Sequence, residues 1–526
     1  MRADWSIYIS FIGAGLVMLL PRNAKNLIRW VALLTGVAGL AVALNSYFLY
    51  NAACDSLIKN TGSGFWHLIN VPWIPALGAH YHLAVDGINF PLIVLTGFVC
   101  VTGVLFSWNI EERVKEFFAF YLTLIAAVYG VFMAMDLFLL FVFYELAIIP
   151  KYFIIAIWGS TRKEYGAMKL VLYSFIGSAL VFIGILAAYF AAGRGTFDLL
   201  ELAKFPIAGP IQVWVFALIF VGFGVLAGMW PFHTWAPTGH VAAPTAASML
   251  LAGVVMKLGA YGCFRAAMGL FPHGLDQWRW IIAWLGVVGI VYGAAVALVQ
   301  KDFKFIIGYS SVSHMGFVLL GLATLTVTGM SGAILQMFSH GVVASLLFAV
   351  VGRMIYDRTH TRQLAELGGL RKALPFAFWT FLIGGAASMG LPGFSGFVAE
   401  IQVLIGAFQM SPWLAASAAV SIAITAGYIL NALHKVFFAE EEHHSGTGVS
   451  PVHGHADNGR DAISTTENRQ DACSTSDSRW NLPGITCPEV VASLILMALL
   501  VIIGLYPSIM LDMIKANVKL FPGVLP

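Results

Sequence analysis

Five ionisable residues stand in the middle of long apolar stretches, and they are the side chains best placed to do chemistry. They are Glu145 in LFVFYELAIIPKYF, Lys257 in LLAGVVMKLGAYG, His314 in YSSVSHMGF, His340 in LQMFSHGVVAS and Glu400 after LPGFSG. A charge at the centre of a bilayer costs about 2.5–3.5 kcal/mol or more, so such residues are candidates for function. An imidazole, whose ordinary pKa is near 6.5, takes up and releases protons at physiological pH. The five residues therefore predict a file that passes protons across a membrane.

Each of these residues also has a structural explanation. A glutamate such as Glu145 can serve only as a hydrogen-bond partner for a neighbouring helix, and a lone buried histidine is often a packing residue with satisfied nitrogens. Lys257 lies too deep in its stretch for its ammonium to reach either surface easily. Because two histidines fall on consecutive stretches between Lys257 and Glu400, the sequence favours a proton relay.

Proline and glycine interrupt two of the apolar stretches. The first break, GMWPFHTWAPTGHVAAPTAAS, contains three prolines and two further candidate proton carriers, His233 and His240. The second break is LPGFSG, just before Glu400. Proline and glycine disrupt the hydrogen-bond ladder of a helix, and interrupted helices at corresponding places in two halves of a chain indicate the ion route of a transporter.

The composition indicates that lipid surrounds most of the chain. Of the 526 residues, 59% are hydrophobic and 10% are charged, whereas about a quarter of the residues in soluble domains are charged. The net charge is only +3 and the basic residues are scattered, which excludes the clustered positive surface of a nucleic-acid-binding protein. The five cysteines have no CxxC or repeated metal-ligand spacing, so we expect no disulfide framework, zinc site or iron–sulfur cluster.

A membrane-spanning helix needs about 20 mostly apolar residues, and the sequence offers fourteen such stretches. We therefore expect an all-α, multi-pass membrane protein. The predicted spans are residues 4–20, 27–50, 88–108, 117–134, 137–158, 166–192, 211–230, 244–266, 278–299, 303–323, 328–355, 374–409 (interrupted), 413–437 and 488–508. The first stretch has no A-x-A-like cleavage site, so we expect it to be retained as a helix.

The two breaks fall in the seventh and twelfth predicted spans, which indicates two five-helix repeats, spans four to eight and nine to thirteen. Because five is odd, the second repeat would cross the membrane in the opposite direction, as inverted repeats do. The predicted organisation is thus 1–116 (N-terminal helices with an external loop), 117–270 (first repeat), 271–438 (second repeat), 439–487 (a polar, low-complexity cytoplasmic loop) and 488–526 (last helix and tail).

Two segments between the predicted spans bear on orientation. Residues 51–87, with two tryptophans (Trp66, Trp73) and two prolines (Pro72, Pro75), predict an external loop at the membrane interface. The 439–487 loop has few apolar residues and is expected to be poorly ordered; its four histidines could bind a metal, but flexible His-rich tracts seldom form a defined site. Most lysines and arginines of the short loops lie on the side of the 439–487 loop. This predicts a bacterial-type inner (cell) membrane protein with both termini outside.

Four long motifs resemble, in order, the proton-conducting core of the antiporter-like subunits of respiratory NADH:quinone oxidoreductase (complex I). They are WPFHTWAPTGHVAAPTAASMLLAGVVMKLGAYG, GYSSVSHMGFVLLG, LQMFSHGVVASLLFAVVGRMIYDRTHTR and LPGFSGFVAE. The stretches YSSVSHMG and YDRTHTR are more similar to the M-type subunit, mitochondrial subunit 4, than to the L or N types. The resemblance covers about residues 85–440.

The resemblance implies a proton-translocating membrane-arm subunit of a translocase, without a redox centre of its own. No cofactor and no metal is then expected in this chain, and NADH, FMN, iron–sulfur clusters and quinone are expected in partner subunits. The expected partners are the lipid bilayer and other membrane-arm subunits, including neighbouring antiporter-like subunits. Glu145 is similar to the family's fifth-helix glutamate, Lys257 to its central lysine, His314 and His340 to the histidines of its hydrophilic axis, and Glu400 to the acidic residue of its broken twelfth helix.

The sequence departs from the family pattern near Glu145. The family's seventh-helix lysine, the usual partner of that glutamate, is replaced by Leu226, and two acidic residues of the first break are replaced by Thr238 and Ala242. Lys151 is a candidate replacement partner, although its position six residues after Glu145 on a helix does not favour direct pairing. The alternative is that its side chain reaches the inner surface.

Two other functions share these features. The same subunit type is built into multisubunit Na⁺/H⁺ antiporters and membrane-bound hydrogenases, and the subunits that purify with the chain would separate these from complex I. A structural subunit with impaired conduction would account for Leu226, and pumping measured with and without Glu145 would identify it.

Overall fold

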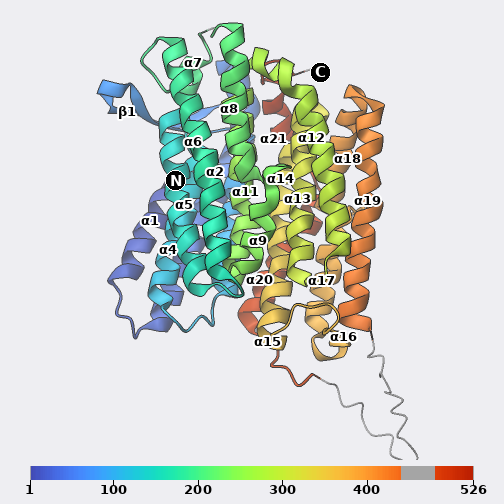
Figure 1. Cartoon of the computed structure of the whole chain (residues 1–526). Helices are drawn as coiled ribbons and strands as arrows, with labels where there is room; N and C mark the ends of the chain where they lie inside the picture. The colour runs from blue at the N-terminus through green and yellow to red at the C-terminus, as the bar shows by residue number, and fades with distance from the viewer. Residues whose placement is uncertain (1, 206, 440–479, 525–526) are drawn as a thin grey trace, which may run out of the picture.

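The computed structural model describes residues 2–205, 207–439 and 480–524, in which long helices stand side by side as a bundle (Figure 1). Within this part of the chain, eleven helices are long and apolar enough to cross a membrane. Four shorter apolar helices accompany them. The prediction of a mostly helical, multi-pass membrane protein is confirmed.

Each predicted span coincides with helix in the structure, and the bounds of 137–158 and 303–323 are reproduced. The main helices are α1 (Trp5–Leu19), α2 (Lys25–Thr61), α3 (Phe90–Phe106), α4 (Val114–Met133), α5 (Leu137–Trp158), α6 (Lys163–Ala192), α8 (Gly209–Ala227), α12 (Pro272–Val299), α13 (Phe303–Ala323), α14 (Val327–Phe348), α17 (Pro375–Ser388), α18 (Ser395–Met410), α19 (Pro412–Leu433) and α20 (Cys487–Leu505). Short helices α7 (Leu199–Leu202), α15 (Asp357–Thr359), α16 (Leu370–Ala373) and α21 (Ser508–Val518) lie between or after them.

The interval 51–87, predicted as a loop, contains regular structure. Helix α2 continues to Thr61, and an antiparallel hairpin follows, formed by β1 (Trp66–Ile74) and β2 (Ala79–Val85). The hairpin is joined to the bundle through its second strand, since the Met135 amide donates to the His82 carbonyl oxygen at 2.9 Å. The hairpin, α7 and the C-terminal end lie at one end of the bundle, and α15 and α16 lie at the other (Figure 1). We call the first the hairpin end.

Both sequence breaks interrupt helices in the structure. Helix α8 ends at Ala227, and a 3-10 turn (Phe232–Thr234) leads into the short helix α9 (Trp235–Ala242). Helix α17 ends at Ser388 and α18 begins at Ser395. Backbone groups freed at such breaks need new partners inside the bundle. The carbonyl oxygen of Ala242 accepts from the Ser160 amide at 2.8 Å, which satisfies one of them.

The span Thr245–Met268 carries the central lysine and is irregular. Its parts are α10 (Thr245–Leu250), a π-helical stretch (Leu251–Val255), α11 (Met256–Gly262) and a second π-helical stretch (Cys263–Met268). All of its most hydrophobic window is buried by other helices. π-helical turns are rare overall but occur often at functional sites. This irregular span is therefore a candidate part of the functional site.

The end opposite the hairpin is fixed by a buried carboxylate. Glu489, in the first turn of α20, accepts hydrogen bonds from Arg353 at 2.6 Å and Arg358 at 2.7 Å. It also closes a capping box with Thr486. These contacts of Glu489 anchor the first turn of α20 to the bundle. Most of the predicted polar loop, its histidines included, lies outside the described residues.

Candidate functional site

Lys257 lies on α11 between the two π-helical stretches and is fully buried, with 0% of its side chain exposed. Its Nζ donates to the Ala252 carbonyl oxygen, which belongs to the preceding π-helical stretch. The same Nζ lies 2.9 Å from Nδ1 of His340 on α14. The structure therefore brings together the lysine and one of the two histidines that the sequence singled out.

His340, His314 and Glu400 continue from Lys257 as one buried group. The rings of His340 and His314 stack with centroids 5.2 Å apart and planes at 28°. His314 Nδ1 on α13 lies 3.1 Å from Oε1 of Glu400 on α18, and Glu400 is 5% exposed. We call Lys257, His340, His314 and Glu400 the central cluster. Four helices contribute its four side chains, which the sequence predicted as a file.

Uncharged polar groups complete the central cluster, and sequence reasoning missed them. The amide nitrogen of Gln336 donates to Glu400 Oε1 at 3.4 Å and lies 3.2 Å from His314 Nδ1. His314 Nε2 lies 3.1 Å from the hydroxyl of Ser388, the last residue of α17. Gln336 is one helical turn before His340 on α14, so the 3.6-residue period places both on one face. That spacing is the signal that could have found it.

The second helix break positions Glu400. Gly390, between α17 and α18, has φ +67, and a Cβ atom at this residue would lie 2.7 Å from Glu400 Oε2. A side chain here would be strained and would displace the carboxylate. Ser395 at the start of α18 contacts Ser339 of α14 at 2.7 Å. The break thus lets the backbone at Gly390 approach the carboxylate closely.

Glu145 and Lys151 lie on α5, apart from the central cluster. Lys151 is 2% exposed, so its side chain is buried in the structure and does not reach the surface. Glu145 is half-buried, and its Oε1 has no hydrogen-bond partner in the described part of the chain. The two side chains interact electrostatically with each other, and Glu145 also interacts with Ser178 of α6. Leu226 on α8 is buried and supplies no charge to this region.

His233 and His240 flank the first break. His233, in the 3-10 turn, packs edge-on against Tyr292 with ring centroids 5.1 Å apart. His240 on α9 is 0% exposed, and neither of its ring nitrogens has a hydrogen-bond partner among the described residues. It interacts electrostatically with Lys257. His240 is therefore near the central cluster, whereas His233 packs against aromatic rings and interacts electrostatically with Lys169.

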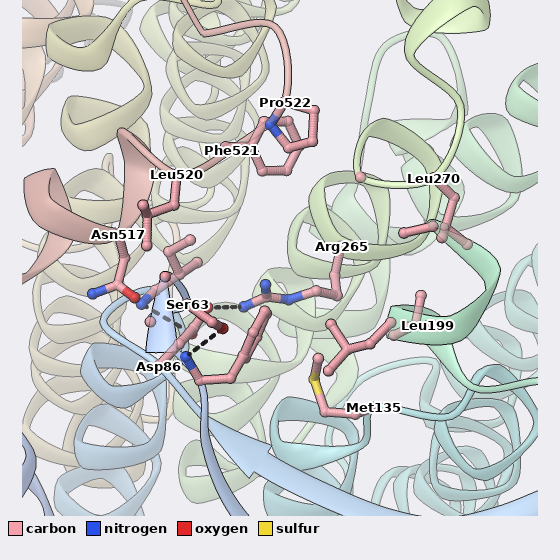
Figure 2. Close-up of a pocket in the computed structure, with 17 residues that line it drawn as sticks. Ser63, Asp86, Met135, Leu199, Arg265, Leu270, Asn517, Leu520, Phe521 and Pro522 are labelled. Carbon is pink, nitrogen blue, oxygen red and sulfur yellow. Dashed lines mark hydrogen bonds and ion pairs between the residues drawn. The ribbon is translucent and has the colours of Figure 1, made fainter. Parts of the chain in front are cut away.

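A cavity of about 230 Å³ opens at the hairpin end (Figure 2). On its wall, Arg265 Nη2 and Asp86 Oδ2 form a buried ion pair at 2.6 Å. Arg265 is on the same span as Lys257, eight residues further along, with Tyr261 midway between them. Its Nε donates to the Tyr261 hydroxyl at 3.2 Å. The pair fixes the hairpin end of this span against the residues that precede α3.

Titratable residues also gather where the hairpin meets α7. His67 Nδ1 lies 2.9 Å from His82 Nε2, and His82 Nδ1 lies 2.5 Å from Asp198 Oδ2. Burial lowers the pKa of His67, and the neighbouring His82 lowers it further. Burial raises the pKa of Asp198, but the His82 hydrogen bond and the backbone N–H groups it caps outweigh this, so the net direction is downward.

No group of three or more His, Cys, Asp or Glu side chains that could hold a metal ion occurs in residues 2–205, 207–439 and 480–524. The arrangement that remains is a buried series of proton acceptors and donors. Hydrogen bonds or ion-pair contacts join Lys257 to His340 and His314 to Glu400, and ring stacking joins the two histidines. Such a series can hold and pass protons between helices.

Comparison with known proteins identifies the relatives of the chain. Residues 134–425 match the family described as NADH:quinone oxidoreductase/Mrp antiporter, TM. The chain is 39% identical to NAD(P)H-quinone oxidoreductase chain 4 3 of Picosynechococcus sp. over 81% of this chain and 78% of that one. It is 35% identical to NADH-quinone oxidoreductase subunit M of Escherichia coli over 97% and 96%. A chain of respiratory complex I from Thermus thermophilus superposes with a TM-score of 0.81 at 26% identity, covering 99% of this chain and 100% of that one.

Proposed function

The chain belongs to the family of transmembrane subunits of NADH:quinone oxidoreductases and Mrp antiporters, and on that premise we propose that its central cluster is the proton-carrying site. The protein is a proton-translocating membrane-arm subunit of an NADH:quinone oxidoreductase, of the subunit M or chain 4 type. One observation carries the assignment of the site: Lys257, His340, His314 and Glu400 form one buried series across four helices.

The proposed mechanism is a cycle of proton binding driven by charge. A proton held at Lys257 passes to His340, which lies 2.9 Å away, then to His314 and on to Glu400. No direct hydrogen bond joins the two rings in the described structure, so this step requires a ring rotation or a bridging water. The energy comes from electron transfer in partner subunits, where NADH, FMN, the iron–sulfur clusters and quinone are bound.

We place the hairpin end and both termini on the outer side of a bacterial-type inner membrane. The support is the excess of lysine and arginine in the loops at the opposite end. The eleven long helices, with α1, α3 and the pair α17 and α18, would give the fourteen spans expected from the sequence. The interruptions after α8 and α17 support two inverted five-helix repeats. Neighbouring membrane-arm subunits would cover part of the exposed apolar surface.

The test of the central cluster is Lys257→Ala in the assembled complex. We expect NADH:quinone oxidoreduction to continue in the presence of an uncoupler, because no redox group depends on this chain. Protons moved per NADH oxidised should fall, measured with a pH-sensitive dye in proteoliposomes. The matched control is Lys59→Ala, which removes an exposed lysine of the same charge. Full pumping in the Lys257→Ala variant would refute the proposed site.

We also propose that Glu145 and Lys151 act as a charge pair on α5. The support is that Lys151 is 2% exposed and that each is the charged partner with which the other interacts. An ammonium buried this deeply is costly unless it is paired. In the family, the glutamate pairs with a seventh-helix lysine, whose position Leu226 occupies in this chain. The pair of Glu145 and Lys151 would replace that family pair.

A relocation experiment tests this pair. Lys151→Met should lower pumping, and adding Leu226→Lys to the same chain should restore it, because the second change returns the lysine to the family's position. The single variant Leu226→Lys is the control for the effect of an added buried charge. Normal pumping by Lys151→Met, with the complex fully assembled, would contradict the pairing.

A further inference from the structure

A second cavity opens at the end opposite the hairpin, next to the first helix break. Its volume is about 190 Å³, and polar side chains from five separate segments line it, among them Ser107, Asn109, Ser160 and Asp357. Lys304, in the first turn of α13, is the one basic residue in its lining. The cavity is roomy enough for several water molecules.

Lys304 lies between this cavity and the broken helix. Its side chain is 2% exposed, and its Nζ donates to the Ala243 carbonyl oxygen at 2.7 Å and to the Val241 carbonyl oxygen at 3.4 Å. Both carbonyl groups lie at the carboxyl end of α9, where a cation is favourable. The ammonium therefore sits at the tip of the half-helix that carries His240.

His240 interacts electrostatically with two buried lysines. They are Lys304, on the cavity wall, and Lys257 of the central cluster. The His240 imidazole is 0% exposed, and both ring nitrogens lack a partner within the described segments. A buried polar group without a partner is costly and requires an explanation. A ring that exchanges protons with its neighbours, directly or through water, provides one.

We propose that this cavity is the mouth through which protons enter the central cluster, with Lys304 as the first residue to receive them. A hydronium ion in the cavity protonates the Lys304 amine. The resulting ammonium passes its proton to His240, and the imidazolium passes it to the Lys257 amine. This inference rests on the proposed function and adds a residue and an entry site to it. It also makes entry independent of Glu145.

The competing explanation is that Lys304 only caps α9. Arg362 Nη1 also donates to the Val241 carbonyl oxygen, at 3.1 Å, and so does the Ser160 hydroxyl, at 3.3 Å. Arginine separates the two explanations, because it keeps a positive donor for the carbonyl oxygens but does not release its proton in proteins. A cap tolerates the exchange of lysine for arginine, and a proton carrier does not.

The experiment compares Lys304→Arg with Lys257→Ala in the reconstituted complex. We expect Lys304→Arg to assemble and to reduce quinone when uncoupled, while protons moved per NADH fall to the value of Lys257→Ala. Arg362→Lys, which alters the neighbouring cap donor, should pump normally. If Lys304→Arg also pumps normally while Lys257→Ala does not, the entry site is refuted and the proposed function stands. If Lys257→Ala itself pumps normally, the proposed function fails.

A second measurement covers the case in which Lys304→Arg does not assemble. Asn109→Cys places a thiol at the cavity in a chain whose Cys473 and Cys487 are replaced by serine. A charged methanethiosulfonate added on that side should lower pumping at least fivefold, and dithiothreitol should restore it. Cysteine at Asn23, an exposed residue of the loop between α1 and α2 on the same side, is the control. Full pumping after complete modification of Asn109→Cys would overturn the proposal.

Discussion

The buried ion pair between Asp86 and Arg265 yields a prediction whose magnitude follows from the structure (Figure 2). The two side chains are 3% and 8% exposed, and the Nη2–Oδ2 distance is 2.6 Å. The guanidinium also lies 5.1 Å from the centroid of the Phe65 ring. Removing one partner of such a pair costs about 3–5 kcal/mol, because the other charge stays buried without compensation. We therefore expect both Asp86→Ala and Arg265→Met to destabilise the subunit by about this amount.

The assay is the rate of irreversible thermal inactivation of the assembled complex, which follows the unfolding rate. If half of the lost free energy lowers the unfolding barrier, the change is about 1.5–2.5 kcal/mol. Since about 1.4 kcal/mol corresponds to a factor of ten, inactivation should accelerate roughly 10- to 70-fold. Lys204→Met is the control, because Lys204 forms an exposed ion pair with Glu201 near the same end. An exposed pair contributes about 0–1 kcal/mol.

The double variant Asp86→Ala with Arg265→Met decides whether charge is the cause. It leaves no unpaired charge, so it should inactivate more slowly than either single variant. Single variants that inactivate within twofold of the unmodified complex would refute the reasoning. A double variant whose acceleration equals the product of the single effects would show that the two residues act independently.

Three further predictions concern other parts of the molecule. The pKa of His67 is lowered by burial and then by His82. The neutral imidazole therefore stabilises the docked hairpin above about pH 6.5, and this stability is lost as the pH falls. Proteolysis just before β1 should accelerate on acidification, and it should accelerate less in the His67→Gln variant. A Cβ atom at Gly259 would lie 2.3 Å from the backbone of α8, whereas nothing lies within 4 Å of one at Gly15; immunoblots should show a several-fold loss of assembled subunit for Gly259→Val and none for Gly15→Val. Glu489→Gln leaves two arginines without their buried counter-charge and should cost about 3–5 kcal/mol; an unchanged yield of assembled complex would contradict this.

The sequence was sufficient to single out the residues whose ionisable side chains stand in an otherwise apolar stretch. Lys257, His314, His340 and Glu400 are conspicuous because each interrupts an apolar stretch, and their separation along the chain requires them to come from different helices. Gln336 and Ser388 carry no charge, and the free-energy cost of placing them in a membrane helix is small. The sequence alone therefore does not single them out. Their role in the central cluster depends on how helices pack, which no local pattern records.

Lys304 shows a different limit of sequence reasoning. It follows Asp302 at the start of a predicted span, so it belongs to the set of inner loop charges used for orientation. The structure buries it because the carboxyl end of α9 docks against α13, a contact between residues about sixty positions apart. The hairpin was missed for a related reason. Its strands alternate weakly, and the pairing of Trp66 with Val85 is fixed by docking onto Met135 and α7.

The packing around Leu226 bears on which route protons take to Lys257. Helices α8 and α11 approach so closely that a Cβ atom at Gly259 would lie 2.3 Å from the Ala227 amide nitrogen and 2.5 Å from the Phe223 carbonyl oxygen. Leu226 lies between these two residues of α8 and is buried. An apolar contact this tight leaves no volume for water, and protons do not cross apolar side chains without water or polar groups. Entry beside α9 therefore requires no opening of this contact, whereas entry past Glu145 would require α8 and α11 to separate.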